Sequence, residues 1–182
     1  MKRLIILSAG ILLCCGCSSN QSAAGSGSGA PRVVPSASEA RRAEMIGKMK
    51  SLEGEWLAKD EKGEIHTMSV FKTTSSGSIV REIMLPGSPL EMTNVYHMDG
   101  PDLLVTHYCD SGNQPRMRCK AASGNQLVFN FDDVTNLSSA KESYMGSLTI
   151  TIKDANHITE QWYSISDGKK EGPTTFELSR KK

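Results

Sequence analysis

Two histidines, a cysteine and a glutamate are spaced so that they could form a metal site. His97 and His107 flank a predicted tight turn, and Cys109 follows two residues later. Imidazole nitrogens bind zinc and other transition metals, and a thiolate or carboxylate, such as that of Cys109 or Glu82, could supply a third ligand. The other interpretation is that both histidines are half-buried strand residues with hydrogen-bonding neighbours.

Strand register decides between these interpretations. If Met98 pairs with Leu103, His97 and His107 point to opposite faces of the sheet, whereas a slip of one residue brings them together. A Cys–His nucleophile is also disfavoured, because His107 and Cys109 lie about 6.6 Å apart along one strand and no oxyanion hole is visible. We therefore expect no catalytic residue, no resident metal and no cofactor.

Arg116 and Glu82 are further candidates for contacting a ligand. Arg116 follows a predicted loop and could bind a carboxylate through two hydrogen bonds, or it could be solvated or paired with Glu82. Glu82 shares a strand face with Val80 and Met84. If that face points inward, Glu82 is a buried carboxylate that needs a partner; if outward, it is a surface charge. With the two histidines, these residues are the candidate ligand-binding set: Glu82, His97, His107 and Arg116.

The composition limits the classes of function. The chain has 182 residues, of which 38% are hydrophobic, with 21 Lys and Arg against 20 Asp and Glu. A nucleic-acid role is disfavoured, because no basic excess is present to neutralise phosphates. No apolar run reaches the roughly 18 residues of a transmembrane helix. The length is that of one domain with appendages.

The N-terminal residues have the pattern of an export signal. A positive head, Met1-Lys2-Arg3, precedes an apolar core over residues 4–13, which is about half the length needed to span a bilayer. The core leads into the sequence Cys-Cys-Gly-Cys at residues 14–17. Export would in turn favour disulfide formation elsewhere in the chain.

This cysteine segment resembles the lipobox of bacterial lipoproteins. Cys17 fits best as the lipidated residue because Gly16 precedes it, although Cys14 stands where leucine is usual. Cys14 or Cys15 as the acceptor, and an ordinary cleaved signal peptide, remain alternatives. The resemblance implies a signal peptide over 1–16, a membrane anchor of acyl chains, and a place in the cell envelope. That place is the outer membrane if the organism has one.

A flexible tether is predicted after the anchor, over residues 17–38. It consists mostly of Ser, Gly, Ala and Pro, which cannot bury enough apolar area to offset the entropy of ordering. Its random-coil reach is about 25 Å. The remaining residues, 39–182, are predicted to form one domain.

That domain begins with a short helix and continues as β-structure. Ser36-x-x-Glu39 is a capping-box pattern for a helix over about 37–51, with an apolar stripe at Met45, Met49 and Leu52 and a weak point at Gly47. From Gly54 onward, turn residues recur about every 10 to 15 positions between segments of alternating polarity. About ten short strands result, which is typical of an antiparallel barrel or sandwich. The longest irregular stretch, 132–146, could cover one mouth of a barrel.

Gly54-Glu55-Trp56, after a short helix, resembles the start of lipocalin and related calycin barrels. In that family a basic residue near the end of the barrel packs over the tryptophan, and Arg180 stands where it is expected. Residues 91–117 also resemble uncharacterised bacterial proteins with lipocalin-like domains. The resemblance covers about residues 52–180 and implies an all-β, antiparallel, lipocalin-like barrel; it brings no activity.

Cys109 and Cys119 are the cysteines that remain in the predicted domain. A hairpin centred on Gln114 would pair them directly, and export favours such a disulfide. A six-residue loop over 110–115 would instead place Thr106 opposite Cys119. A disulfide and two free thiols therefore both remain open.

These observations favour a non-enzymatic binding protein that holds a small, mostly apolar molecule in a barrel interior. A structural or protein-interaction lipoprotein with a packed core is the first alternative, and a metal-dependent or Cys–His enzyme is the second. The expected partners are the small molecule and, through the lipid anchor, the membrane. The sequence does not determine the oligomeric state.

Overall fold

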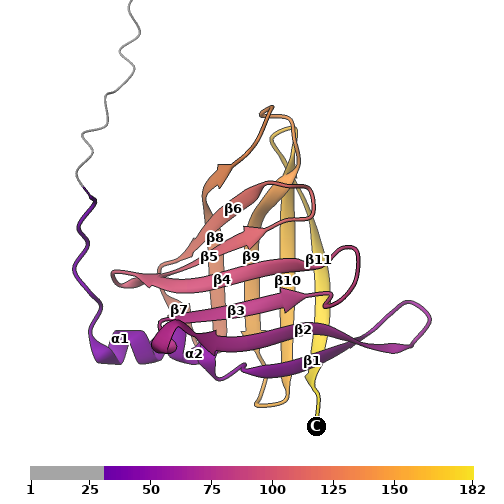
Figure 1. The fold of residues 1–182 in the computed structure, drawn as a ribbon, viewed down its shortest axis with the longest axis horizontal. Helices are drawn as coiled ribbons and strands as arrows, with labels where there is room; N and C mark the ends of the chain where they lie inside the picture. Colours follow the sequence, from indigo (N-terminus) through magenta and orange to yellow (C-terminus); the bar gives the residue numbers. More distant parts are fainter. Residues whose placement is uncertain (1–30) are drawn as a thin grey trace, which may run out of the picture. The chain divides into compact units, whose positions relative to one another are not determined.

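Residues 54–180 form a meander of antiparallel strands in which each strand pairs with the next along the chain, except that β6 pairs with β8 and not with β7 (Figure 1). The computed structural model describes residues 31–182, so the predicted signal peptide, Cys17 and most of the predicted tether lie outside the described residues. The strands are β1 (Gly54–Lys59), β2 (Ile65–Thr74), β3 (Ile79–Met84), β4 (Met92–Asp99), β5 (Asp102–Tyr108), β6 (Gln114–Cys119), β7 (Ala122–Ser123), β8 (Gln126–Thr135), β9 (Tyr144–Ile152), β10 (His157–Ser166) and β11 (Lys169–Arg180).

The sheet closes on itself, which makes it a barrel and rules out a sandwich. β6 pairs with β8 on one side of the meander, and β1 pairs with β11 on the other. The two-residue β7 lies beside β8 and takes no part in the ring. The closed antiparallel barrel of ten strands confirms the predicted fold class. Closure also leaves few strand edges available for unwanted pairing.

Opposite walls of this ring run in different directions. In Figure 1, β1 to β4 run across the view while β9 to β11 run from top to bottom. β4 and β10 are diametrically opposed, since four strands separate them on either side of the ring. Side chains that point inward from β4 and from β10 therefore approach the same central region.

Two short helices precede the barrel: α1 (Glu39–Glu44) and α2 (Ile46–Lys50). The cap of α1 is Ser38, whose Oγ accepts a hydrogen bond from the backbone N–H of Arg41, so the predicted capping residue, Ser36, was wrong by two positions. The break between the helices falls at Met45, with φ −98° and ψ −82°, and Gly47 continues α2. No helix among the described residues has the length and apolarity needed to cross a membrane.

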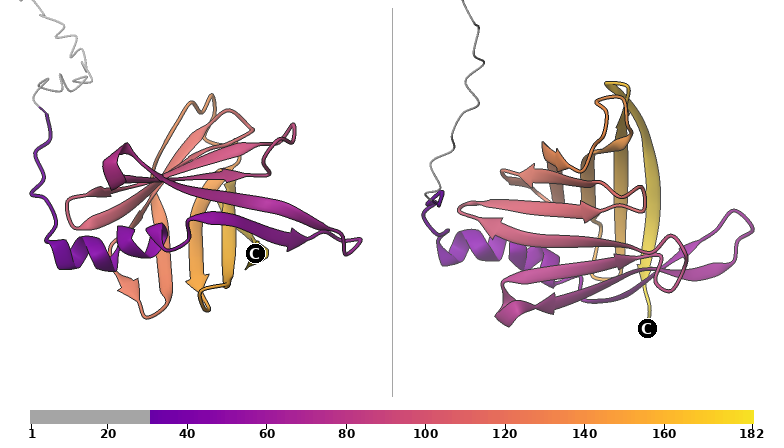
Figure 2. Two further views of the ribbon diagram at one scale, coloured as in Figure 1. Left: turned by 60° about the horizontal axis from the view of Figure 1, so that its bottom comes forward. Right: turned by 45° about the horizontal axis from the view of Figure 1, so that its top comes forward.

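The predicted apolar stripe of the helical segment is buried. Met45, Met49 and Leu52 are at most 1% exposed, and they join the barrel core. α2 packs beside β2, β3 and β4, which places the helices at one end of the barrel (Figure 2). We call this end the helix end. At the opposite end, the loop end, lie the connections 60–64, 85–91, 109–113, 136–143 and 167–168.

The predicted irregular stretch 132–146 is shorter than expected. β8 continues to Thr135 and β9 begins at Tyr144, so the connection comprises residues 136–143. Asn136 Nδ2 donates to the carbonyl of Gly112 at 2.7 Å, and Asn113 Nδ2 donates to the carbonyl of Ser143 at 3.0 Å. Loops 109–113 and 136–143 are thereby joined at the loop end.

Trp56 and Arg180 hold the two ends of the barrel together. They are register partners, and the Arg180 guanidinium lies 4.4 Å from the centre of the indole ring. The guanidinium also donates to the carbonyls of Ser51, Glu53 and Ala155, and Trp56 Nε1 donates to the carbonyl of Leu52. A cation over an indole face adds roughly 0.5–2 kcal/mol to these bonds.

Gly54 makes this arrangement sterically possible. Its φ is +128°, and a Cβ at this position would lie 3.1 Å from Nη1 of Arg180. A side chain here would therefore meet both an unfavourable backbone conformation and the guanidinium. The contact that the calycin resemblance implied is present, with the glycine beneath it.

Arg180→Ala tests how much this contact stabilises the closed barrel. We expect the free energy of unfolding to fall by about 2–4 kcal/mol, because the substitution removes charged hydrogen bonds to three carbonyls and the cation–π contact. Urea unfolding measures the loss. Lys181→Ala, which removes an exposed ion pair with Glu55, is the matched control and should change stability much less. Equal stability of Arg180→Ala and the parent would contradict the proposed role of the contact.

Candidate functional site

A row of polar side chains crosses the inner wall of the barrel on three neighbouring strands. Glu82 on β3 is the register partner of Asn94 on β4, which in turn is the partner of His107 on β5. All three are at most 1% exposed. Cross-strand partners point to the same face of a sheet, so the three side chains lie next to one another inside the barrel.

Glu82 is the acceptor at the centre of this row. Its Oε1 accepts a hydrogen bond from Ser69 Oγ at 2.7 Å. Its Oε2 accepts two more, from Asn94 Nδ2 and Tyr96 Oη, each at 2.8 Å. Three donors on one carboxylate stabilise its ionised form, although burial opposes them and raises the pKa of Glu82 above its usual range. Glu82 therefore points into the barrel, and the alternative of an exposed surface charge does not apply.

The tautomer of His107 follows from the same chain of hydrogen bonds. Asn94 donates through Nδ2 to Glu82, so its Oδ1 is the acceptor for Nδ1 of His107, at 2.7 Å. Nδ1 must then carry the proton, and Nε2 of the neutral ring is an acceptor. Burial lowers the pKa of His107 to about 4, so the ring is neutral at neutral pH. Nε2 is buried and has no hydrogen-bond partner within residues 31–182.

The opposite wall contributes Glu160 and Trp162 from β10. Trp162 Nε1 donates to Oε2 of Glu160 at 3.1 Å, and the Trp162 ring lies 5.1 Å from the His107 ring, measured between centroids. Glu160 is completely buried; no other N–H or O–H group of the described chain donates to its Oε1, and its carboxyl group is hydrogen-bonded with that of Glu82. The indole of Trp162 thus contacts both Glu160 and His107. We call Ser69, Glu82, Asn94, Tyr96, His107, Glu160 and Trp162 the carboxyl cluster.

The two carboxyl groups influence each other's ionisation. Burial raises the pKa of Glu160 well above its usual value, and the nearby charge of Glu82 raises it further. Burial and the charge of Glu82 also keep the hydroxyl of Tyr96 protonated by raising its pKa. The two carboxyl groups are also hydrogen-bonded to each other, and of the two it is Glu160 whose neutral form is favoured more strongly. Such a pair can give up or take one proton.

The carboxyl cluster lies in an interior that is otherwise apolar and well packed. Its largest fully buried apolar neighbours in the core are aromatic: Trp56, Phe71 and Phe129. Tyr96 packs edge-on against Phe129, with 5.8 Å between the ring centroids. The cluster residues themselves are at most 3% exposed, so side chains fill the centre of the barrel.

A surface groove lies where β1 and β11 separate. Within residues 31–182, their pairing comprises Trp56 with Arg180 and Leu57 with Ser179, after which the β1–β2 hairpin extends away from β11 (Figures 1 and 2). The seam groove between them has a volume of about 400 Å³, and Leu57, Ile65 and Phe176 line it. Phe176 is the register partner of Glu160 and packs against the core, so this residue connects the groove with the carboxyl cluster.

His97 does not share a site with His107. Met98 pairs with Leu103, which is the register that directs the two histidines to opposite faces. His97 is half-buried on the outer face, and burial, together with the charges of Arg116 and Arg118, lowers its pKa against the opposing effect of Asp99. A metal site that requires both histidines, and a Cys109 nucleophile with His97 as its base, are excluded by this register.

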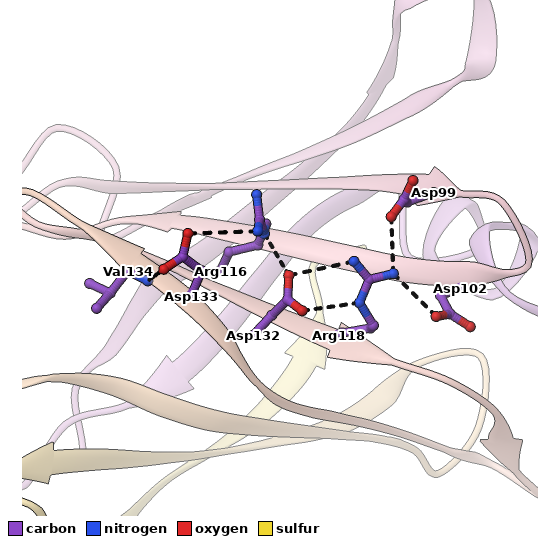
Figure 3. A network of polar contacts seen from close by, with 7 residues as sticks. All are labelled: Asp99, Asp102, Arg116, Arg118, Asp132, Asp133 and Val134. Carbon is purple, nitrogen blue, oxygen red and sulfur yellow. Dashed lines mark hydrogen bonds and ion pairs between the residues drawn. The ribbon is translucent and has the colours of Figure 1, made fainter. Parts of the chain in front are cut away.

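Arg116 also lies on the outer face, and its charge is neutralised there. Its Nε donates to Asp132 at 2.7 Å, and its Nη2 lies 3.7 Å from Asp133 (Figure 3). Arg118 beside it contacts Asp99, Asp102 and Asp132 at 3.0 to 3.3 Å. These ion pairs join the β4–β5 hairpin to β6 and β8, across the second closing joint of the barrel. Arg116 is therefore not part of the interior site that the sequence predicted for it.

Of the two alternatives left open by the sequence, the structure has the free thiols: Cys109 and Cys119 are not joined by a disulfide. Thr106 pairs with Arg116 and Leu103 with Cys119, so Cys119 lies six residues along the strand from Cys109. At about 3.3 Å per residue, this separation is far beyond the reach of a disulfide. The register also differs from the alternative in which Thr106 faces Cys119.

The carboxyl and imidazole groups that lie close enough together for a metal ion are found elsewhere. Within the described residues they are Asp60, Glu64 and His66, all exposed around the turn of the β1–β2 hairpin. Hydrogen bonds from the backbone N–H groups of Lys62 and Glu64 to Asp60 explain this grouping as turn structure. In the carboxyl cluster, a metal on Glu82 would have to displace its three hydrogen-bond donors.

Sequence reasoning missed most of the carboxyl cluster. The alternation of polarity in β10 could have identified Glu160. Ile158, Glu160 and Trp162 share one strand face, and a glutamate between two large apolar residues on one face indicates a buried acid. Asn94 and Tyr96 alternate in the same way on β4. No local sequence pattern could have predicted that side chains of β3 and β10 meet inside the barrel, because the two strands are far apart in the sequence.

No protein-family model matches this chain, and no curated protein is significantly similar to it in sequence. The barrel, its closing contact and the buried cluster are therefore the basis for assigning a role.

Glu160→Gln tests the ionisation of the buried pair. A folded-state pKa raised above 4.5 stabilises the protein at low pH, and this contribution is lost as pH rises from 4.5 through the raised pKa. Glutamine does not titrate, so the variant should gain stability relative to the parent progressively above pH 4.5. Urea unfolding at a series of pH values measures the difference.

The matched control for this measurement is Glu177→Gln on the exposed face of β11. Its ion pair with Lys153 lowers the pKa of Glu177, so its removal should produce no rising gain in stability above pH 4.5. Parallel stability curves for Glu160→Gln and the parent across this range would show that Glu160 is ionised in the folded barrel.

Proposed function

We propose that the barrel binds a small, mostly apolar molecule whose polar end meets the carboxyl cluster. One observation carries the proposal: Nε2 of His107 is a buried acceptor without a partner in the described chain, beside the Trp162 ring, in a mostly apolar interior. Leaving a buried polar atom unpaired costs roughly 1–3 kcal/mol. A ligand that donates a hydrogen bond to this nitrogen recovers that cost.

The packed interior requires that the ligand displace side chains. Methionines at Met68, Met84 and Met117 belong to the core, and such flexible, polarisable side chains re-pack readily. The seam groove gives an approach, because Phe176 lines it and is the cross-strand neighbour of Glu160. Movement of this one ring would join the groove to the carboxyl cluster.

A structural or protein-interaction role with a permanently filled core is the second candidate. The observation in its favour is the near-zero exposure of the interior side chains. It predicts that no small molecule enters the barrel, which is what separates it from the first proposal. We do not propose the enzymatic alternative that needs His97 and His107 in one site, because these side chains lie on opposite faces of the sheet.

Ligand binding is tested by titrating the purified full-length chain with octan-1-amine, octanoate and octan-1-ol. We expect saturable binding of at least one of them at one molecule per chain, detected as a change in tryptophan fluorescence, since Trp162 lies in the carboxyl cluster. Phe176→Ala should accelerate association several-fold in stopped-flow measurements. Ile65→Ala, at the exposed rim of the same groove, is the control and should leave the rate near that of the parent.

The outcome that contradicts this proposal is the absence of saturable binding of any of the three probes to a folded barrel. The packed-core candidate would then stand.

We also propose that the barrel is anchored in the cell envelope through acyl chains on Cys17, on the strength of the lipobox resemblance. Metabolic labelling with an alkyne analogue of palmitate tests the anchor in the parent and in Cys17→Ala. Labelling should disappear in Cys17→Ala and persist in the control, Cys15→Ala. Persistence of the label in Cys17→Ala would exclude Cys17 as the acceptor.

A further inference from the structure

We infer that the barrel binds the surface of an anionic phospholipid membrane through its helix end. The inference goes beyond the proposed ligand binding and does not depend on it. The proposed anchor on Cys17 enters only as the reason why a membrane is within reach. Three features of the described residues carry the inference: opposite charges at the two ends of the barrel, basic side chains without carboxylate partners, and the place at which the chain enters the barrel.

The two ends of the barrel carry opposite net charges. The connections that form the loop end contain seven Asp and Glu and two Lys, a side-chain balance of −5. The helix end contains eight Lys and Arg and four Asp and Glu, a balance of +4, over residues 34–53, 75–78, 100–101, 120–125, 153–156 and 181–182. The chain as a whole has a net charge of only +1, so its composition conceals this separation. An anionic surface attracts one end and repels the other, and it therefore orients the barrel.

Ion pairs neutralise only part of the positive charge at the helix end. Arg41, Lys153 and Lys181 pair with glutamates. Five basic residues have no carboxylate partner within residues 31–182: Arg42, Lys48, Lys50, Lys120 and Lys182. The acidic residues of the helix end that pair with no lysine or arginine number three: Glu39, Glu53 and Asp154. A positive excess therefore remains, and each Lys or Arg near an anionic surface strengthens binding roughly fivefold.

Arg42 and Lys50 line a groove between the helices and the β2–β3 turn. The groove has a volume of about 530 Å³, and Ser76 and Ser78 of the turn contribute to its lining. The oxygens of a phosphodiester accept hydrogen bonds, so guanidinium, ammonium and hydroxyl groups are suited to bind a lipid head group. Glu39 also lines the groove, but the two cations outnumber it.

The chain enters the barrel at this same end. Val34 packs against the β4–β5 turn so closely that a Cβ on Gly100 would lie 2.3 Å from its Cγ1. The predicted tether between Cys17 and this point has a random-coil reach of about 25 Å. The twelve residues of β11 span roughly 40 Å, at about 3.3 Å per residue. An anchor on Cys17 therefore brings the helix end to the membrane more readily than the loop end.

Co-sedimentation of the full-length Cys17→Ala chain with vesicles tests the inference without acyl chains on Cys17. Vesicles of phosphatidylcholine alone are compared with vesicles in which one third of the lipid is phosphatidylglycerol. We expect the chain to bind the anionic vesicles at least about tenfold more tightly than the neutral ones. High salt should remove the preference, because it screens the attraction between charges. Binding to the neutral vesicles measures the contribution of the apolar N-terminal residues.

Two double variants of equal net charge separate the helix end from the rest of the chain. Arg42→Glu with Lys50→Glu reverses two charges at the helix end, and Lys62→Glu with Lys141→Glu reverses two at the loop end. We expect the first variant to lose most of the preference for anionic vesicles and the second to keep it within about twofold. Far-UV circular dichroism shows whether each variant is folded.

Hydrogen exchange of the Cys17→Ala chain on the same vesicles needs no substitution in the barrel, so it decides the question if the helix-end variant does not fold. Backbone amides of residues 39–50 and 120–125 should exchange several-fold more slowly on anionic than on neutral vesicles. Amides of residues 60–64 and 136–143, at the loop end, should exchange at the same rate on both.

Three outcomes overturn the inference. Equal loss of the preference in both double variants would show that net charge, and not the helix end, determines binding. Slower exchange at the loop end would show the opposite orientation. The absence of any preference in the parent chain would exclude the lipid surface and favour an acidic protein as the partner of the helix end. None of these results bears on the binding of the octyl probes or on the labelling of Cys17.

Discussion

Closure of the sheet is the constraint on which the other features of this protein depend. The joint between β1 and β11 is formed by two register pairs in the described chain, and the Arg180 guanidinium over Trp56 secures it by bonding to three carbonyls as well. Because the joint is short, the β1–β2 hairpin can diverge from β11 and leave the seam groove. Because it holds, β4 and β10 face each other across a common interior.

The carboxyl cluster forms because β4 and β10 face each other across the barrel interior. Glu82 and its donors come from β2 to β4, while Glu160 and Trp162 come from β10, and neither half would be buried if the sheet stayed open. Glu82 is satisfied by three donors and can remain ionised. Glu160 receives one from Trp162, and burial together with the charge of Glu82 raises its pKa well above the usual value. A purely apolar filling would be the more stable solution for a barrel that only needed a core.

The sequence predicted the strands and their closure well, and the local details less well. Period-two alternation between regularly spaced turns identified ten strands, and Gly54, Trp56 and Arg180 identified the joint. The helix cap was assigned to Ser36 instead of Ser38, since both serines are acceptable caps. The loop before β9 was predicted too long, because the end of β8 is exposed and carries no apolar alternation to mark it.

What the sequence determined by itself is the strand pattern, the pair of residues that closes the barrel, and the identity of the groups that could do chemistry. The tertiary structure decided which of those groups meet. Side-chain direction in a strand reverses with a shift of one residue, so register alone separated His97 from His107 and Cys109 from Cys119. Contact between Glu82 and Glu160 depends on the curvature of the whole sheet, which no local segment encodes.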